Sequence, residues 1–298
     1  MAFNLRTFKT RALTAVIFVV VMLGSLLINQ WTFFVLFSVI HFGCWVEYQR
    51  LVGLIDKKYG QVTPFHKYGV MLAGWGIMLW FTGAGYSFFG LQLHELGWWV
   101  GLISIFLLPL IALLFTKNIR LKNIGYSIFG LVYISLCWGL MMDLYGMKTG
   151  NSLLYKKSHF YPVYFPLVII GCMWINDTMA YITGSFIGRT PLSKISPKKT
   201  WEGTIGGIIL CSLIMGYVAY SYDGSSVFGQ PLYSWIILAF IAAIAGTVGD
   251  LLESKLKRLA GVKDSGSLMP GHGGFLDRFD SMLVATPVAW LYIRLFMH

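Results

Sequence analysis

The chain has 298 residues, of which 57% are hydrophobic and 12% charged, and its formal net charge is +11. Ordinary soluble domains carry about 25% charged residues, so this composition excludes a soluble globular protein and indicates an integral membrane protein. A bilayer core offers no water to backbone groups, so the spans are expected to be helices. The predicted fold class is all-α, a polytopic transmembrane helical bundle of about nine helices with a cytoplasm-facing polar cleft in its C-terminal half.

Apolar runs follow one another along the chain, and several approach the roughly 20 residues that a helix needs to cross a bilayer. The first run follows three basic residues, as in a signal peptide. However, its end offers no small-residue cleavage site, so a retained helix is predicted. The second and ninth runs look short, so each would either tilt little or extend into the interface. The runs cover residues 12–29, 31–46, 68–90, 98–116, 124–143, 162–187, 204–221, 233–252 and 282–297.

The distribution of Lys and Arg predicts the orientation. With a cytoplasmic N-terminus and nine alternating helices, 19 of the 23 basic residues fall on the cytoplasmic side. This bias explains the net charge without a nucleic-acid partner. The four exceptions are Lys148, Lys156, Lys157 and Arg294.

The two halves of the chain differ in character. Residues 1–160 contain apolar helices with plain basic loops, which is typical of a transmembrane scaffold, whereas residues 161–298 hold nearly all the polar groups beside helices. We therefore expect the chemistry in the second half of one integrated membrane domain. The cysteines lie singly in apolar runs, which predicts buried thiols without disulfides; they are Cys44, Cys137, Cys172 and Cys211.

The sixth apolar run contains the pair Asn176-Asp177, and an aspartate inside a membrane helix is costly unless it faces a polar cavity or partner. Asp177, Tyr181, Gly184 and Gly188 share one helical face, which places a carboxylate beside a surface that another helix can approach closely. A second interpretation is that the pair only forms hydrogen bonds with neighbouring helices.

The next polar segment runs from Ser193 to Thr204 and contains Ser196-Pro197-Lys198-Lys199. Proline favours a turn, so both lysines are expected on a short constrained loop. Thr200 is predicted to cap the seventh helix. Lysines next to a helix N-terminus suit a polyphosphate, although a basic loop that binds anionic headgroups is an equally good interpretation.

The polar stretch between Asp250 and Ser281 holds five of the chain's 12 acidic residues. Asp250, Ser254 and Lys257 would share a face if the eighth helix continues. Lys263 and Asp264 begin an irregular stretch, and the glycines around His272 allow backbone N–H groups to approach an anion. Asp277 and Asp280 are three positions apart at the start of the ninth helix, beside Arg278, so they would share a helical face.

This stretch offers oxygen ligands without paired His or Cys, which favours a hard cation such as Mg²⁺ over zinc. Asp250 and Asp264 are the predicted metal ligands, because each lies at a break where its side chain can turn inward. A charged helix end is more often a solvated surface, but glycine, histidine and both signs of charge are combined densely here.

These residues resemble the signature of CDP-diacylglycerol synthases, also called phosphatidate cytidylyltransferases. The match includes almost every fixed position, with Met269 where that family more often has Ile or Leu. The segments around Asn176 and Ser196 also resemble the family, in the expected order, whereas the first 160 residues agree only in being apolar and multi-pass. The matching signature residues are Ser254, Leu256, Lys257, Arg258, Lys263, Asp264, Gly266, Pro270, Gly271, His272, Gly273, Gly274, Asp277, Arg278 and Asp280.

The resemblance implies an Mg²⁺-dependent reaction of CTP with phosphatidate that gives CDP-diacylglycerol and pyrophosphate, and it suggests a second cation, with a monovalent ion as one candidate. A phosphate monoester is already an anion, so catalysis should consist of positioning and charge neutralisation. The expected catalytic residues are Asp250, Asp264, Lys263, His272, Asp277, Arg278 and Asp280. The expected substrate-binding residues are Asn176, Asp177, Ser196, Lys198, Lys199, Ser254, Lys257, Arg258, Gly273 and Gly274.

The alternatives are a CTP-dependent polyprenol or phytol kinase, which would transfer the γ-phosphate, and an ion-coupled transporter. Transporters usually show polar helix breaks in both halves, and the first half here has none. The resemblance also predicts a bacterial plasma membrane enzyme with its N-terminus and active-site loops in the cytoplasm. The small-residue faces of the second half leave room for a homodimer.

Overall fold

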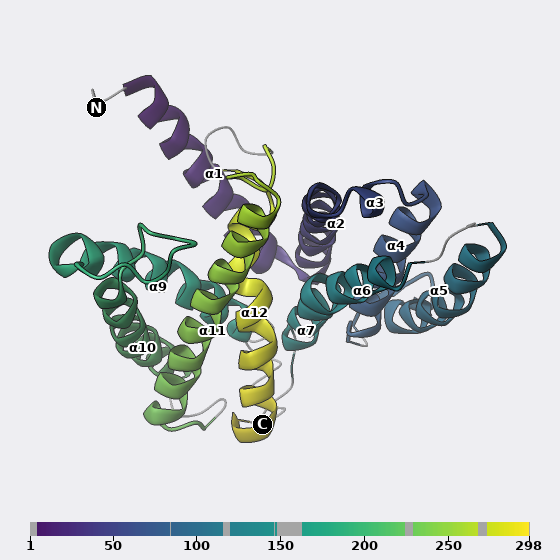
Figure 1. The fold of residues 1–298 in the computed structure, drawn as a ribbon. Coiled ribbons are helices and arrows are strands. Elements are labelled where there is room, and N and C mark those ends of the chain that lie inside the picture. The colour runs from purple at the N-terminus through teal and green to yellow at the C-terminus, as the bar shows by residue number, and fades with distance from the viewer. Residues whose placement is uncertain are drawn as a thin grey trace. The chain divides into compact units, whose positions relative to one another are not determined.

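The structure is a computed structural model that describes residues 5–83, 85–115, 120–145, 147, 163–223, 229–267 and 273–297. The described residues are almost entirely helical (Figure 1). One short hairpin pairs β1 (Ser87–Phe88) with β2 (Leu91–Gln92). The helices are α1 (Leu5–Ile28), α2 (Gln30–Ile55), α3 (Lys57–Gly60), α4 (Pro64–Trp80), α5 (Leu93–Phe115), α6 (Leu121–Gly130), the π-helix η1 (Leu131–Leu136), α7 (Cys137–Leu144), α9 (Tyr164–Ile187), α10 (Trp201–Asp223), α11 (Leu232–Leu259), α12 (Leu276–Tyr292) and the π-helix η2 (Ile293–Met297).

Seven helical segments of the described chain are long and apolar enough to cross a membrane, which confirms an all-α, multi-pass protein. Each of the nine predicted apolar runs contains a helix, and two of these helices, α1 and α4, are not among the seven. The run predicted at residues 68–90 was too long, because α4 ends at Trp80 and the β1–β2 hairpin follows. The second and ninth apolar runs are short, and both continue as helix beyond their apolar parts, which was one of the two outcomes expected for them. Helix α2 has 26 residues and the last span, Leu276–Met297, has 22, because polar residues continue both helices.

The chain forms two compact units. The first contains Met1–Met142 and Leu256–Phe279, and the second contains Asp143–Lys255 and Asp280–His298. Both α11 and α12 therefore contribute residues to each unit. The predicted functional division at residue 160 is a separate matter and stays a prediction.

In the first unit, α2 contributes many buried side chains. It buries large side chains such as Phe33, Phe37 and Trp45, and also the polar side chains of His41 and Glu47. Both His41 and Trp45 bond to the hydroxyl of Ser135 on η1, at 2.9 and 2.8 Å. A helix predicted as plain scaffold therefore carries several buried polar groups.

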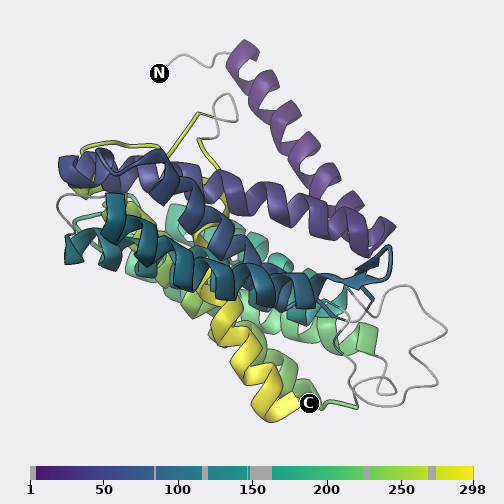
Figure 2. The same cartoon turned by 90° about the vertical axis from the view of Figure 1, so that its right-hand side faces the viewer.

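In the second unit, α9 and α10 pack closely through small residues. A Cβ atom on Gly203 would lie 2.8 Å from the Ala180 carbonyl oxygen, and one on Gly207 would lie 2.7 Å from the Ala180 Cβ. Figures 1 and 2 also show α12 alongside α11, and their backbones nearly touch where Gly249 faces the carbonyl of Asp280. The small-residue face of α9 thus packs against α10 of the same chain. The homodimer stays a prediction.

Candidate functional site

The second unit contains a cavity of about 310 Å³ between α9, α10 and α11. It brings the polar pair of the sixth apolar run, the lysine loop and the end of the eighth run together. The structure thus places the first two polar segments and Asp250, the first residue of the third, around one cavity, whereas residues 256–279 of the third segment belong to the first unit. Its lining residues are Asn176, Asp177, Ala180, Tyr181, Gly184, Ser185, Lys198, Lys199, Thr200, Thr204, Thr247 and Asp250.

The loop that carries Lys198 and Lys199 is closed at its base, as predicted. Pro191 and Thr200 form an antiparallel bridge, and the Leu192 N–H donates to the Lys199 carbonyl at 2.7 Å. The Lys199 N–H in turn donates to the Ser196 carbonyl at 3.1 Å, so Ser196 shapes the turn through its backbone. The lysines therefore enter the cavity from a fixed loop.

Helix α10 begins directly after this loop. The Thr200 hydroxyl accepts the Gly203 N–H at 3.2 Å, which confirms the predicted cap. In the first turn, the Glu202 carboxylate accepts the N–H groups of Arg189 (3.1 Å) and Thr190 (3.2 Å). Glu202 thereby ties the end of α9 to the start of α10 and helps to hold the lysine loop.

Asp250 lies on the wall of the cavity formed by α11. Its carboxylate forms an ion pair with Lys199 and accepts the Ser254 hydroxyl at 3.3 Å. The predicted face with Asp250 and Ser254 therefore exists. Because about a quarter of the Asp250 side chain is exposed, it can still reach a ligand in the cavity.

Asp280 adds a third carboxylate to this region of the second unit. Asp280 is 9% exposed, and its carboxylate accepts the Ser281 N–H at 2.6 Å. The carboxylate also interacts electrostatically with Asp250, Asp177 and Lys199. Three aspartates and one lysine therefore interact electrostatically at one end of the unit. Carboxylates this close repel one another when ionised, so a bound cation would stabilise their charged forms.

The donor set of this region fits a hard cation. The Asn176 side-chain oxygen is buried and has no hydrogen-bond partner among the described residues, while its amide donates weakly to Thr247 at 3.4 Å. No group of three or more His, Cys, Asp or Glu side chains in the described chain already has the geometry of a metal site. That finding is compatible with Mg²⁺, which commonly takes one or two carboxylates and completes its shell with phosphate oxygens and water.

The glycine-rich segment belongs to the first unit, where Asp277 holds its two ends. The carboxylate accepts the N–H groups of Ser265 (2.9 Å) and Gly274 (2.8 Å), and it forms an ion pair with Lys257 at 2.6 Å. Gly273 has a φ of 81°, which favours glycine. Asp277 thus organises this segment, and its oxygens are already engaged.

Glu47 of α2 is the residue that the sequence analysis missed. It is 7% exposed and accepts the N–H groups of Phe275 and Leu276, each at 2.9 Å, and the Ser265 hydroxyl at 2.7 Å. Two of these donors belong to the orphan N–H groups at the start of α12, where a carboxylate is most stabilising. An acid within an otherwise apolar helix was the available signal.

The other predicted residues lie as follows. Lys263 and Asp264 are exposed in the first unit, with no hydrogen bond or ion pair recorded in the described chain. Arg258 is exposed and donates to the Val262 carbonyl at 3.3 Å, and Arg278 is exposed at the start of α12. His272 lies outside the described residues.

These features define a multi-pass helical membrane protein with a charged cavity between helices of its second unit. Residues 9–296 match the family model described as the cytidylyltransferase family. The chain therefore belongs to the cytidylyltransferase family.

Relatives of nearly equal length carry a more specific name. The phosphatidate cytidylyltransferase of Pseudomonas aeruginosa is 30% identical over 288 residues, 94% of this chain and 94% of that protein. The Bacillus subtilis protein of the same name is 28% identical over 292 residues, which cover 97% of this chain and 98% of that protein. Phosphatidate cytidylyltransferase 5, chloroplastic, of Arabidopsis thaliana is 37% identical over 204 residues, 64% of this chain. There the match spans about half of the relative's length, 50%.

Proposed function

We propose that the protein transfers a cytidylyl group from CTP to phosphatidate, giving CDP-diacylglycerol and pyrophosphate. A phosphate oxygen of the lipid would form a bond with the α-phosphorus of CTP. The bond from that phosphorus to the oxygen bridging to the β-phosphate would break, and its electron pair would leave with pyrophosphate. The observation that carries the proposal is the cavity that joins Lys198 and Lys199 to Asp250 in a chain whose full-length relatives bear this name.

The attacking lipid phosphate is already an anion, so the protein mainly has to overcome repulsion between phosphates. Lys198 and Lys199 would bind the triphosphate from the fixed loop. Lys199 already neutralises Asp250, and a bound triphosphate would offer its ammonium group a second anionic partner. The closed base of the loop keeps both ammonium groups near the cavity, which lowers the entropic cost of positioning them.

The cofactor that we propose is Mg²⁺, held by Asp250 together with Asn176 or Asp280. When bound, it would neutralise charge on the phosphates of both substrates. Asp264, the other predicted ligand, is exposed in the first unit, so its part in metal binding rests on the resemblance. The second cation rests on the same ground.

In the first unit, we propose that Glu47 and Asp277 are positioning residues. Together they bind Ser265 and residues 274–276, which include the predicted phosphate-binding residue Gly274. Holding Gly274 in place lowers the ordering cost of its contact with a phosphate. Lys257, Arg258, Lys263, His272 and Arg278 remain proposed phosphate contacts.

We propose a cytoplasmic location for the cavity in a bacterial plasma membrane. The predicted topology places both the lysine loop and Asp250 on the cytoplasmic side. Arg294, one of the four basic residues predicted outside, bonds at 2.7 Å to Asp143, which the same topology also places outside. The predicted topology thus places the Asp143–Arg294 pair on the outer side and the lysine loop with Asp250 on the cytoplasmic side, so both groups agree with the same orientation of the second unit.

Product analysis with two labels tests the proposal. Purified protein in detergent is given phosphatidate, Mg²⁺ and CTP labelled at either the α- or the γ-phosphate. Cytidylyl transfer puts the α-label in lipid and the γ-label in pyrophosphate. A polyprenol or phytol kinase would instead put the γ-label in lipid, and only when the alcohol is supplied. That result would replace the proposed function.

A further inference from the structure

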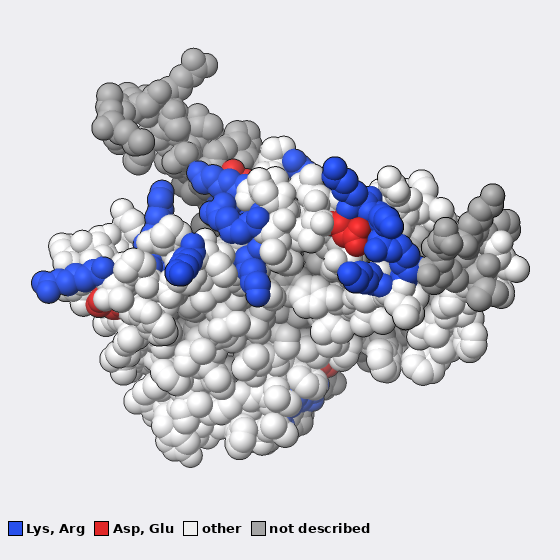
Figure 3. All heavy atoms as spheres, viewed as in Figure 1, with Lys and Arg blue, Asp and Glu red and all other residues white. Residues whose placement is uncertain are grey.

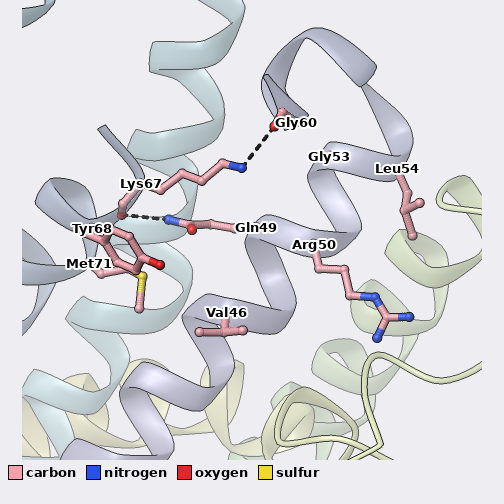
Figure 4. Close-up of a pocket in the computed structure, with 9 residues that line it drawn as sticks. All are labelled: Val46, Gln49, Arg50, Gly53, Leu54, Gly60, Lys67, Tyr68 and Met71. Atoms are coloured by element: carbon pink, nitrogen blue, oxygen red, sulfur yellow. Dashed lines mark hydrogen bonds between the residues drawn. The ribbon is translucent and has the colours of Figure 1, made fainter. Parts of the chain in front are cut away.

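The first unit has a cavity of its own, of about 390 Å³, where the ends of α2 and α4 are joined by α3 (Figure 4). We call it the α2–α4 groove. None of its residues has a part in the function proposed above. Its lining residues are Val46, Gln49, Arg50, Gly53, Leu54, Gly60, Lys67, Tyr68 and Met71.

The walls of the groove are fixed by backbone contacts. A Cβ atom on Gly53 would lie 3.3 Å from the Gly60 Cα, so α2 and α3 approach closely at the floor. The Gln49 side chain, 9% exposed, donates to the Lys67 carbonyl at 3.0 Å and links α2 to α4 (Figure 4). The groove is thus a built feature of the fold.

The groove is positively charged and has no acidic lining residue. The Lys67 ammonium donates to a neutral partner, the Gly60 carbonyl, at 3.0 Å. Arg50 is exposed, and no ion pair or hydrogen bond of its side chain is recorded within the described residues. Both cations therefore keep most of their capacity to bind an anion.

The acidic residue next to the groove, Asp56, already has partners outside the groove. Asp56, between α2 and α3, accepts the Lys58 N–H at 3.0 Å and lies 3.4 Å from Arg120. The Lys58 N–H and the Arg120 charge hold the pKa of Asp56 below its usual value, so it stays ionised on these partners. Figure 3 shows Lys and Arg side chains gathered around a small acidic patch over the α2–α3 end.

The remainder of the lining is apolar and partly exposed. Val46 is 56% exposed, Leu54 48% and Tyr68 68%. These side chains belong to or adjoin α2, a predicted membrane span, so they are expected to face lipid near the interface. A basic groove that continues into an apolar surface matches the boundary between a phospholipid headgroup and its acyl chains.

We infer that the α2–α4 groove binds the headgroup of an anionic phospholipid. Lys67 contacts the phosphate, and Arg50, whose side chain points away from Lys67 (Figure 4), adds positive charge at the rim of the groove. The exposed side chains of Val46 and Tyr68 contact the upper acyl chains. A soluble phosphate compound would use the two cations and leave the apolar lining unused. The predicted topology puts the groove on the cytoplasmic side, where anionic lipids attract basic residues.

The test uses the full-length protein in phosphatidylcholine nanodiscs with increasing phosphatidylglycerol, an anionic lipid that has no phosphomonoester. Retained phosphatidylglycerol is counted by native mass spectrometry after release into detergent. The test variant is Arg50→Gln with Lys67→Gln. The matched control is Lys58→Gln with Lys122→Gln, which removes the same charge from the same unit without altering the groove lining.

The control should bind nearly as the wild type does. A basic residue near an anionic surface contributes about fivefold in binding, so the test variant should bind roughly 25-fold more weakly. If both variants bound phosphatidylglycerol equally weakly, the loss of affinity would come from the lower net charge of the unit and not from the groove, which would overturn the inference. Full displacement of the lipid by millimolar glycerol 3-phosphate would overturn the lipid as occupant. Size-exclusion profiles and retained cytidylyl transfer verify that the variants fold.

Discussion

Replacing Glu47 by alanine tests whether a buried carboxylate on α2 positions the glycine-rich segment. The substitution removes the acceptor for two backbone N–H groups and one hydroxyl, all within 2.9 Å. Hydrogen bonds to charged groups contribute about 1.5–3 kcal/mol each. They are not additive here, because water can enter the space that alanine leaves. We expect a local destabilisation of about 3–5 kcal/mol, because three buried donors lose their acceptor at about 1–3 kcal/mol each before water enters.

The consequence for activity follows from geometry. A displacement of about 1 Å at a positioning group can reduce a rate about 100-fold, so Glu47→Ala should lower kcat by at least that factor. Glu47→Gln keeps one acceptor oxygen and should fall between alanine and wild type. Ser265→Ala, which removes the hydroxyl shared by Glu47 and Asp277, should have a smaller effect in the same direction.

The assay is cytidylyl transfer with kcat and KM for CTP measured separately, together with the thermal midpoint in detergent. Glu95→Ala is the control, since Glu95 is an exposed acid in the first turn of α5. A folded Glu47→Ala protein with wild-type kcat and KM would refute the reasoning. If the Glu47→Ala protein does not fold but the Glu47→Gln protein does, the kcat of Glu47→Gln decides whether Glu47 positions the segment.

Further predictions concern the cavity and the loops. Asp250→Asn should abolish most transfer and weaken the Mg²⁺ dependence, measured by titrating the metal after chelation. Thr200→Ala removes the α10 cap and should cost about 1 kcal/mol, seen as a lower thermal midpoint in detergent. The pKa of Asp56 is lowered from 3.8, so its stabilising effect should be full above that pH and disappear as the pH falls through the lower folded value. The difference in thermal midpoint between wild type and Asp56→Asn should therefore shrink in acid; an unchanged difference would contradict it.

The helical architecture was predictable because hydropathy over a span is a property of local sequence. The constrained lysine loop and the Thr200 cap were also predictable, since proline and a capping threonine act on residues next to them. The coupling of Asn176, Lys199 and Asp250 followed from chemistry, because each is a polar group that an apolar helix end does not need.

The role of Glu47 could not be predicted in the same way. Its donors are 218 to 229 residues away in sequence, and two of them are backbone N–H groups that any residue could supply. The sequence therefore contains no side-chain pattern from which the contacts of Glu47 with residues 265, 275 and 276 could be predicted. The glycines of α9 and α10 posed a similar problem, because a small-residue face does not reveal whether its partner lies in the same chain or in another copy.

The most direct test of the central claim compares wild type with Asp250→Asn and Lys199→Met for transfer of label from α-labelled CTP to phosphatidate. Both variants alter the ion pair on the cavity wall. The account predicts label in lipid for the wild type and at least a 100-fold loss for each variant, with folded protein in every case. Wild-type transfer rates in both variants would mean that the cavity between α9, α10 and α11 is not where the phosphates react.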